Sequence, residues 1–434
     1  MRLKNGRRVG AAAAVLSAAA LLAACGGGAQ PGGGAGAGGA SAWGIFGGSE
    51  DMFRATFEQW NTDNPDEQIA VEWFANDAYK EKIRTSVGAG NAPTLIYSWG
   101  GGTLADYVAN DAVIDLTGKT GDLTDRVIPS VAASGQVDGT TYAVPNTETQ
   151  PLILFYNQQV LDDAGVEVPT TYDELLAAVA PLESAGVTPI ALAGQSVWPE
   201  LMWIEYLTER IGGPEVFQAV VDGEPGAWSD PAILEATTKI RELVDAGAFG
   251  DSFGSVNADQ AGDTALLQTG QAAFLLQGTW VQPGFLKSAP EFAASGDLGY
   301  TTFPAVEGGV GDPANIVGNP SNFWSISADA SAEAQATASD FLANRTLDDA
   351  AVDELLALNL VPPVLGIEDT IAEQDDAEYL SFVYEMVSDA PNFQLSWDQA
   401  LPAAQAQALL ENLSQLFLGQ IDPEQFSAAM DATL

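Results

Sequence analysis

The chain of 434 residues contains no histidine and a single cysteine, Cys25. Without histidine it lacks the commonest general base, the commonest zinc ligand and any catalytic Ser-His or Cys-His arrangement. One cysteine allows no internal disulfide framework and no cysteine metal site. We therefore expect no metal, no cofactor and no catalytic residues of these classes.

Positive charge is also scarce. The chain has 15 lysines and arginines against 59 aspartates and glutamates, which gives a formal net charge of -44 at pH 7. Binding to nucleic acid requires cations that neutralise phosphates, so nucleic acid is excluded as a partner. The same balance argues against anionic substrates. The simplest consequence of the charge is a soluble, strongly acidic surface.

No hydrophobic run after residue 25 is long enough to cross a membrane. The run at residues 9–24 follows four cations, is short, and is typical of a signal peptide. It ends in Leu22-Ala23-Ala24-Cys25, which resembles a bacterial lipobox, where cleavage precedes the cysteine and the thiol is acylated. We predict a signal peptide at residues 1–24 and lipidation at Cys25. An ordinary secretory signal with an unrelated cysteine is the alternative, and Arg7-Arg8 leaves both Sec and twin-arginine export open.

Residues 26–42 are almost entirely glycine and alanine. Such a segment cannot bury a core, so we expect residues 25–42 to be a lipidated cysteine followed by a flexible tether. Several acyl chains on one cysteine hold a protein at a membrane well, whereas one chain holds it weakly. The folded part is therefore expected at the extracellular face of the cell membrane, attached by its lipid.

The folded part begins with alternating strand and helix patterns. Strands are predicted at residues 42–47, 69–74 and 94–99, and helices follow each of them. This order predicts a parallel sheet with helices on its faces, in which ligands bind beyond the carboxyl ends of the strands. Gly100-Gly101-Gly102 follows the third strand and lacks the spacing and lysine of a phosphate loop. We expect these glycines to let the backbone approach a ligand or another helix closely.

The segment at residues 139–165 predicts a passage between two lobes. Residues 142–145 form a short strand that Pro145 ends, and a polar stretch follows at residues 146–150. The apolar run at residues 152–156 then fits a buried strand. Strand, polar break and strand indicate that the chain leaves one α/β lobe and enters another.

A second passage is expected later in the chain. The strand at residues 298–303 and the glycine-rich loop up to Asn319-Pro320 are interpreted as the return to the first lobe, which then includes a strand at residues 323–326. The chain goes back to the second lobe and ends in helices. The predicted lobes are residues 43–145 with 300–345, and residues 146–299 with 346–434.

Several motifs resemble one known family. They are YAVP, YN and AG, then PTTYDEL, within residues 142–175, and NAPTLIYSWGGGTLADYVANDAVIDLT at residues 91–117. The order and spacing of these motifs resemble those of the maltose-binding-protein-like carbohydrate receptors of bacterial ABC importers, and the resemblance covers nearly all of residues 43–434. Gln158 and Thr94 stand where lysine and aspartate are common. The resemblance implies a two-lobed α/β periplasmic-binding-protein fold, type II-like, with a hinge, a cleft and ABC transporter permease subunits as partners.

A sugar ligand presents flat C–H faces to aromatic rings and hydroxyl groups to polar side chains. Trp280 follows Gly278-Thr279 and matches the family's stacking tryptophan; Trp397 matches another stacking position, beside Asp398. Glu148 matches an acidic ligand residue of the family, whereas Trp99 and Trp198 are open between ligand contact and core. The candidate ligand-binding residues are Trp280, Trp397, Asp398, Trp99, Gly100, Glu148, Trp198, Asn146 and Asn319.

The expected function is a monomeric receptor that binds a di- or oligosaccharide without chemistry, closes around it and delivers it to a permease; a xylo-oligosaccharide is our guess for the sugar. One alternative keeps the fold and binds another solute, such as a polyamine, since aromatic rings and carboxylates also suit a cation. Another is a glycosidase that uses Glu148 and Asp398, because that chemistry needs no histidine. A structural lipoprotein without ligand is a third.

Overall fold

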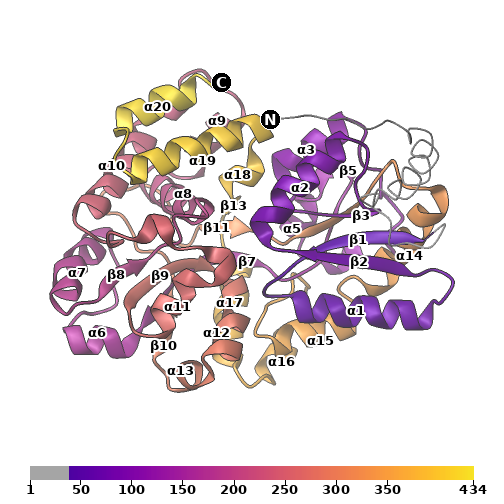
Figure 1. The fold of residues 1–434 in the computed structure, drawn as a ribbon, viewed down its shortest axis with the longest axis horizontal. Coiled ribbons are helices and arrows are strands. Elements are labelled where there is room, and N and C mark those ends of the chain that lie inside the picture. Colours follow the sequence, from indigo (N-terminus) through magenta and orange to yellow (C-terminus); the bar gives the residue numbers. More distant parts are fainter. Residues whose placement is uncertain (1–38) are drawn as a thin grey trace, which may run out of the picture.

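The computed structural model describes residues 39–434. The predicted signal peptide, Cys25 and most of the predicted tether lie outside these residues. Figure 1 shows two lobes side by side, one built mainly from the first part of the chain and the other from its middle and end. Among residues 39–434, no helix combines the length and the apolar character that crossing a membrane requires. The two-lobed α/β architecture expected from the sequence is confirmed.

The first lobe is built on a five-stranded sheet in the order β2-β1-β3-β12-β6. Its first three strands are parallel, as the alternating pattern predicts, and β12 runs antiparallel to β3 and β6. The strands are β1 (Ala40–Ile45), β2 (Ile69–Phe74), β3 (Leu95–Ser98), β6 (Val144–Pro145) and β12 (Phe323–Ile326), with a separate hairpin of β4 (Gln136–Val137) and β5 (Thr140–Thr141). Its helices are α1 (Glu50–Asp63), α2 (Asn76–Gly88), α3 (Gly101–Ala109), α4 (Leu123–Arg126), α5 (Pro129–Ala133), α14 (Ala332–Arg345) and α15 (Asp349–Ala357).

The second lobe is built on a six-stranded sheet in the order β13-β11-β7-β9-β8, with β10 also paired to β7. The strands are β7 (Gln150–Asn157), β8 (Thr188–Ala191), β9 (Ala272–Gly278), β10 (Leu298–Thr301), β11 (Ile316–Asn319) and β13 (Phe393–Leu395). The α-helices are α6 (Gln158–Ala164), α7 (Tyr172–Ser184), α8 (Trp198–Gly212), α9 (Pro214–Val221), α10 (Pro231–Asp245), α11 (Gly262–Gln268), α12 (Gln282–Ser288), α13 (Pro290–Ala294), α18 (Trp397–Ala400), α19 (Ala403–Phe417) and α20 (Pro423–Asp431). Short 3-10 turns are η1 (Ala227–Ser229), η2 (Phe253–Ser255), η3 (Ala258–Gln260) and η4 (Thr279–Val281).

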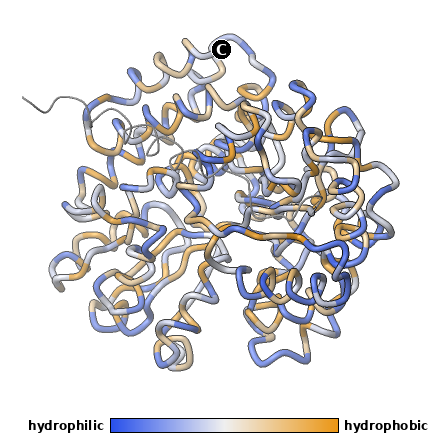
Figure 2. The backbone as a smooth tube through the Cα atoms, turned by 45° about the vertical axis from the view of Figure 1, so that its right-hand side comes forward, coloured by the Kyte–Doolittle hydropathy of each residue, from blue (hydrophilic) through white to orange (hydrophobic). Residues whose placement is uncertain are grey.

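The apolar interior forms two clusters: one joins the first lobe with one face of the second sheet, and the other lies within the second lobe. Figure 2 shows hydrophobic residues along the central strands and an alternation of hydrophobic and hydrophilic residues along the peripheral helices. Strand β7 carries a run of buried residues and lies inside the second sheet, between β11 and β9. Helix α8 is buried all along residues 199–210, since it packs against α10, α19 and the second sheet. Its first turn, at Trp198, is thereby fixed at the edge of the cleft between the lobes.

Three segments connect the lobes: residues 146–149, residues 320–322, and the stretch between α15 (Asp349–Ala357) and β13 (Phe393–Leu395). Strand β6 lies in the first sheet and β7 in the second, so the chain crosses at residues 146–149, within the segment that the sequence singled out. A second crossing, at residues 320–322, connects β11 to β12. The backbone N–H of Asn146 donates to the Asn322 carbonyl over 2.8 Å, and that of Thr149 donates to the Val361 carbonyl over 2.7 Å. These hydrogen bonds tie the crossings into one hinge.

Two predicted lobe boundaries are wrong. Residues 300–319 do not belong to the first lobe, because β10 and β11 both pair with β7 of the second sheet. Residues 346–364 do not belong wholly to the second lobe, because α15 packs against α1 and Val364 bridges to Val127. The chain returns to the second lobe through α16 (Glu368–Ala372) and α17 (Ala377–Asp389), and the α17 residue Tyr379 packs edge-on against Tyr300 of β10.

Candidate ligand-binding site

A cleft of about 680 Å³ lies between the lobes, within the range of about 300–1,000 Å³ typical of small-molecule sites. The first lobe contributes the turn after β1, the start of α2 and the end of β3. The second lobe contributes the start of α8, the segment around η3, and the turn that follows β9. The carboxyl ends of β1 and β3, where the sequence predicted a ligand site, therefore border this cleft.

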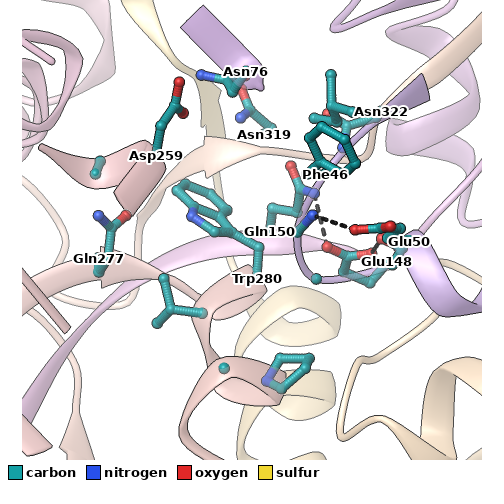
Figure 3. A pocket seen from close by; sticks show the side chains of 18 of the residues that line it. Phe46, Glu50, Asn76, Glu148, Gln150, Asp259, Gln277, Trp280, Asn319 and Asn322 are labelled. Atoms are coloured by element: carbon teal, nitrogen blue, oxygen red, sulfur yellow. Dashed lines mark hydrogen bonds between the residues drawn. The ribbon is translucent and has the colours of Figure 1, made fainter. Parts of the chain in front are cut away.

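Two tryptophans of the second lobe line this cleft. Trp280 lies on η4, directly after β9, and its ring projects into the middle of the cavity, between Gln277 and Asp259 on one side and Phe46 on the other (Figure 3). Trp198, at the first position of α8, places its ring 6.0 Å from that of Trp280 at an angle of 54°. Its indole Nε1 is buried and has no hydrogen-bond partner among the described residues. Together they form an aromatic wall of the cleft.

The first lobe also contributes aromatic groups. Trp99 touches the cleft but is only 8% exposed, because its ring packs edge-on against Tyr79 and Tyr97. Phe46 is 51% exposed and projects from the turn after β1. Phe46 is not among the residues predicted from the sequence, although it is the last apolar residue before Gly47-Gly48 at a predicted strand end. An aromatic residue at a predicted strand end, directly before two glycines, is the sequence signal that could have identified it.

Glu148 lies at the bottom of the cleft on the first crossing segment, and its side chain is fully buried. Ser49 Oγ donates to Glu148 Oε2 over 2.6 Å, Thr147 Oγ1 donates to the same oxygen, and Gln150 Nε2 donates to Oε1 over 2.8 Å. Burial, together with the charge of Glu148, raises the pKa of the neighbouring Tyr97 phenol well above its usual value. The carboxylate thus ties the first lobe to the hinge and still borders the cavity.

Two further carboxylates line the cleft with amide partners. Asp398 accepts from Gln399 Nε2 over 2.8 Å and from Lys80 Nζ over 3.3 Å, so it connects the two lobes. Asp263 accepts from Gln277 Nε2 over 2.9 Å, and burial raises the pKa of the Asp263 carboxyl although Gln277 partly opposes the shift. Asp263, Gln277, Gln150 and Asn322 all border the cavity, and the sequence analysis selected none of them.

Three of the candidate residues lie elsewhere. Trp397 is wrong as a ligand contact, because it is fully buried in the second lobe and stacks on Phe217. Gly100 does not line the cleft; a Cβ there would lie 2.6 Å from the Ser134 carbonyl oxygen. Asn146 is buried beside the hinge and does not line the cavity either. The six that do line it are Trp280, Trp198, Trp99, Glu148, Asp398 and Asn319.

The glycines after β3 have a different role. A Cβ at Gly101 would lie 2.5 Å from the Gln399 carbonyl oxygen, and a Cβ at Gly102 would lie 2.5 Å from that of Leu401. The sequence predicted that these glycines allow close approach either to a ligand or to another helix. The structure shows the second: Gly101 and Gly102 approach α18 and Leu401, the residue after it. This contact joins α3 to α18 beside the cleft.

The lobes also meet at the mouth of the cleft. The backbone N–H of Asp77 donates to Asp259 Oδ2 over 3.2 Å, and Lys287 Nζ lies 3.5 Å from Asp51 Oδ2. Burial and the charge of Asp259 raise the pKa of the Asp77 carboxyl. Among residues 39–434, no group of three or more acidic or cysteine side chains is arranged to hold a metal ion. What the cavity offers a ligand is aromatic faces together with carboxylate and amide groups.

Known proteins share this architecture. The sequence profile of the family described as bacterial extracellular solute-binding protein matches residues 47–351. A probable sugar-binding periplasmic protein of Rhizobium meliloti is 29% identical over 235 residues, which cover 52% of this chain and 54% of that protein. The chain thus matches about half the length of this curated relative.

Solved structures match over more of the chain. A structure from work on xylan utilization by the thermophilic bacterium Caldanaerobius polysaccharolyticus has a TM-score of 0.81 and 28% identity, and the match covers 91% of this chain and 100% of that one. A chitin oligosaccharide binding protein has a TM-score of 0.80 and 22% identity over 91% and 97% of the two chains, which shows a shared fold. Since the family profile covers most of the described residues, this chain belongs to the bacterial extracellular solute-binding proteins.

Proposed function

We propose that this protein is a receptor that captures a di- or oligosaccharide outside the cell and delivers it to the permease of an ABC importer. The observation that carries the proposal is the interlobe cleft in which Trp280 and Trp198 form an aromatic wall beside carboxylate and amide groups. Rings stack on the C–H faces of sugars, and the polar groups hydrogen-bond hydroxyls. The printed description of the Rhizobium relative as sugar-binding supports the same class of ligand.

Binding without chemistry follows from how the cleft can work. A ligand that contacts Trp280 on the second lobe and Phe46 on the first favours the conformation in which both surfaces approach each other. Hinge closure of this kind is a known response of periplasmic binding proteins. We propose that the protein acts as a monomer, that it is not an enzyme, and that acylated Cys25 and the segment at residues 26–42 hold it at the outer face of the membrane.

The test is thermal unfolding of the full-length protein, purified in mild detergent, with a panel of mono- and oligosaccharides, polyamines and amino acids. A ligand at 100 times its Kd stabilises the folded protein by about 2.7 kcal/mol, which is visible as a shift in Tm. We expect a shift with one class of sugar and no new product by chromatography afterwards. A Tm shift with polyamines alone would show that the ligand is a polyamine and not a sugar. A hydrolysis product would show that the protein is an enzyme and not a receptor.

A matched pair of variants locates the site. Trp280→Ala should abolish the sugar-dependent Tm shift, because its ring borders the cavity. Trp73→Ala, on the edge strand β2 away from the cleft, should keep the full shift. Equal shifts in both variants would show that the sugar binds elsewhere.

A further inference from the structure

The carboxylates of the cleft are arranged in a repeated pattern. Three of them, Glu148, Asp263 and Asp398, each accept a hydrogen bond of 2.8–2.9 Å from the side-chain nitrogen of a nearby glutamine. The glutamines are Gln150, Gln277 and Gln399. Since each amide nitrogen already donates to a carboxylate, oxygen atoms make up most of what these three pairs can offer a ligand.

Two asparagines, Asn319 at the end of β11 and Asn322 on the second crossing, also border the cleft. The side-chain oxygen of each is buried without a partner among the described residues, and Asn322 as a whole is only 3% exposed. An amide carries no charge, so neither side chain supplies a cationic partner for an anion.

The charges of the lining are unbalanced. Only two lysines and, among the described residues, no arginine border the cavity. Lys80 is engaged with Asp398 and lies 5.1 Å from the centre of the Trp99 ring. Lys287 is 80% exposed at the mouth and lies near Asp51. The six carboxyl side chains of the lining are Glu50, Asp51, Glu148, Asp259, Asp263 and Asp398. No cation in the interior is thus available to an incoming anion.

We propose that this cleft selects uncharged sugars that donate hydrogen bonds through their hydroxyl groups, and that it rejects sugars that carry a carboxylate, such as oligosaccharides substituted with uronic acid. This inference rests on the proposed function. A carboxylate enclosed between the lobes would lose its water without gaining a cationic partner. It would also be repelled by the carboxylates around it, more strongly in the enclosed cavity than in water.

The experiment compares matched ligands by titration calorimetry with the full-length protein in mild detergent. The probes are xylo-, cello-, manno- and chito-oligosaccharides, each as the neutral form, with one uronic acid residue attached, and with that uronate converted to its methyl ester. We expect a neutral form to bind, its uronate to bind at least about tenfold more weakly, and the ester to recover most of the affinity. The ester has the bulk of the uronate without its charge, so it separates repulsion from steric exclusion.

Each other result has a distinct meaning. A uronate that binds as tightly as its neutral form would overturn the inference and leave the sugar receptor intact. An ester as weak as the acid would show that size, not charge, excludes the group, and would also overturn the inference. No binding by any sugar of the panel would overturn the proposed function and the inference with it.

Variants place the repulsion in the cleft. Asp263→Asn removes an interior carboxylate at nearly constant side-chain shape. It should narrow the difference in affinity between the uronate and its methyl ester severalfold. Asp51→Asn, at the exposed mouth, should narrow it too, because it also frees Lys287; this variant serves if Asp263→Asn does not fold. Glu235→Gln, on the exposed face of α10, is the matched control and should leave the difference unchanged. A difference that no cleft variant alters would contradict the proposal.

Discussion

Trp397 stacks face to face on Phe217, with ring centroids 4.3 Å apart and ring planes within 1° of parallel. Trp228 meets the same tryptophan edge-on, and no part of Trp397 is exposed. Trp397→Ala should therefore lower the free energy of unfolding by about 3–5 kcal/mol, as expected when a large core side chain is removed. Urea denaturation followed by circular dichroism measures this loss.

The matching comparison is Trp280→Ala, which removes a partly buried ring at the cleft and should cost less stability than Trp397→Ala. The two variants thus separate a core tryptophan from one that borders the cleft. A Trp397→Ala protein with unchanged stability and lost sugar binding would contradict the assignment of Trp397 to the core.

The error over Trp397 has a physical origin. Trp397 was selected because it matches a stacking position of the family that the chain resembles, next to Asp398, and Asp398 does line the cleft. Adjacent residues at the start of a helix point in different directions, and the partner of Trp397 lies on α9, far away in the sequence. No local pattern indicates that contact. Trp280 borders the cleft, as its place after Gly278-Thr279 at a strand end suggested, because it stands on η4 directly after β9.

The fold, like the site, was predictable where it depends on local sequence patterns and not where it depends on long-range pairing. The parallel strands β1, β2 and β3 follow from the alternation of strand and helix patterns, and the first crossing follows from Pro145 and the polar residues after it. The second crossing was placed too early because the strand pattern predicted at residues 298–303 does not specify its partner strand. Antiparallel pairing with β7 keeps β10 in the second lobe, and this pairing is a long-range interaction.

The burial of Glu200 predicts that the stability of the protein depends on pH. It lies in the first turn of α8, 1% exposed, and burial raises its pKa from 4.5 to about 8. A carboxyl group with a higher pKa in the folded protein than in the unfolded chain binds protons preferentially to the folded state. The contribution of Glu200 to the free energy of unfolding is therefore fully present below pH 4.5. It is lost as the pH rises to about 8, at up to about 1.4 kcal/mol per pH unit.

Glu200→Gln removes this titration while it keeps the shape of the side chain. The variant should lose less stability than the parent between pH 5 and 8 and should be the more stable protein at pH 8, measured by urea denaturation across that range. Glu235→Gln, on the exposed face of α10, should follow the parent curve. Parallel curves for Glu200→Gln and the parent would refute the prediction.

Gly102 tests the contact between the lobes. A Cβ at this position would lie 2.5 Å from the Leu401 carbonyl oxygen and 2.6 Å from that of Ala400, distances at which backbone atoms must move. Gly102→Ala should push α3 away from α18 and enlarge the radius of gyration in X-ray scattering. Gly88→Ala, where a Cβ meets nothing within 4 Å, should leave the scattering unchanged. Identical scattering from both variants would show that the approach of the lobes does not depend on Gly102.

The ion pair between Lys80 and Asp398 should stabilise the contact of the two lobes in the absence of ligand. Its atoms lie 3.3 Å apart, and the two side chains are 31% and 9% exposed, so solvent screens the pair only partly. A double-mutant cycle of Lys80→Met and Asp398→Asn should give a coupling energy of about 0.5–3 kcal/mol, measured by urea denaturation of the four proteins. Lys80→Met alone should be the more harmful single change, because it leaves a nearly buried carboxylate with Gln399 as its remaining donor. Additive effects of the two substitutions would mean that the pair forms without holding the lobes together.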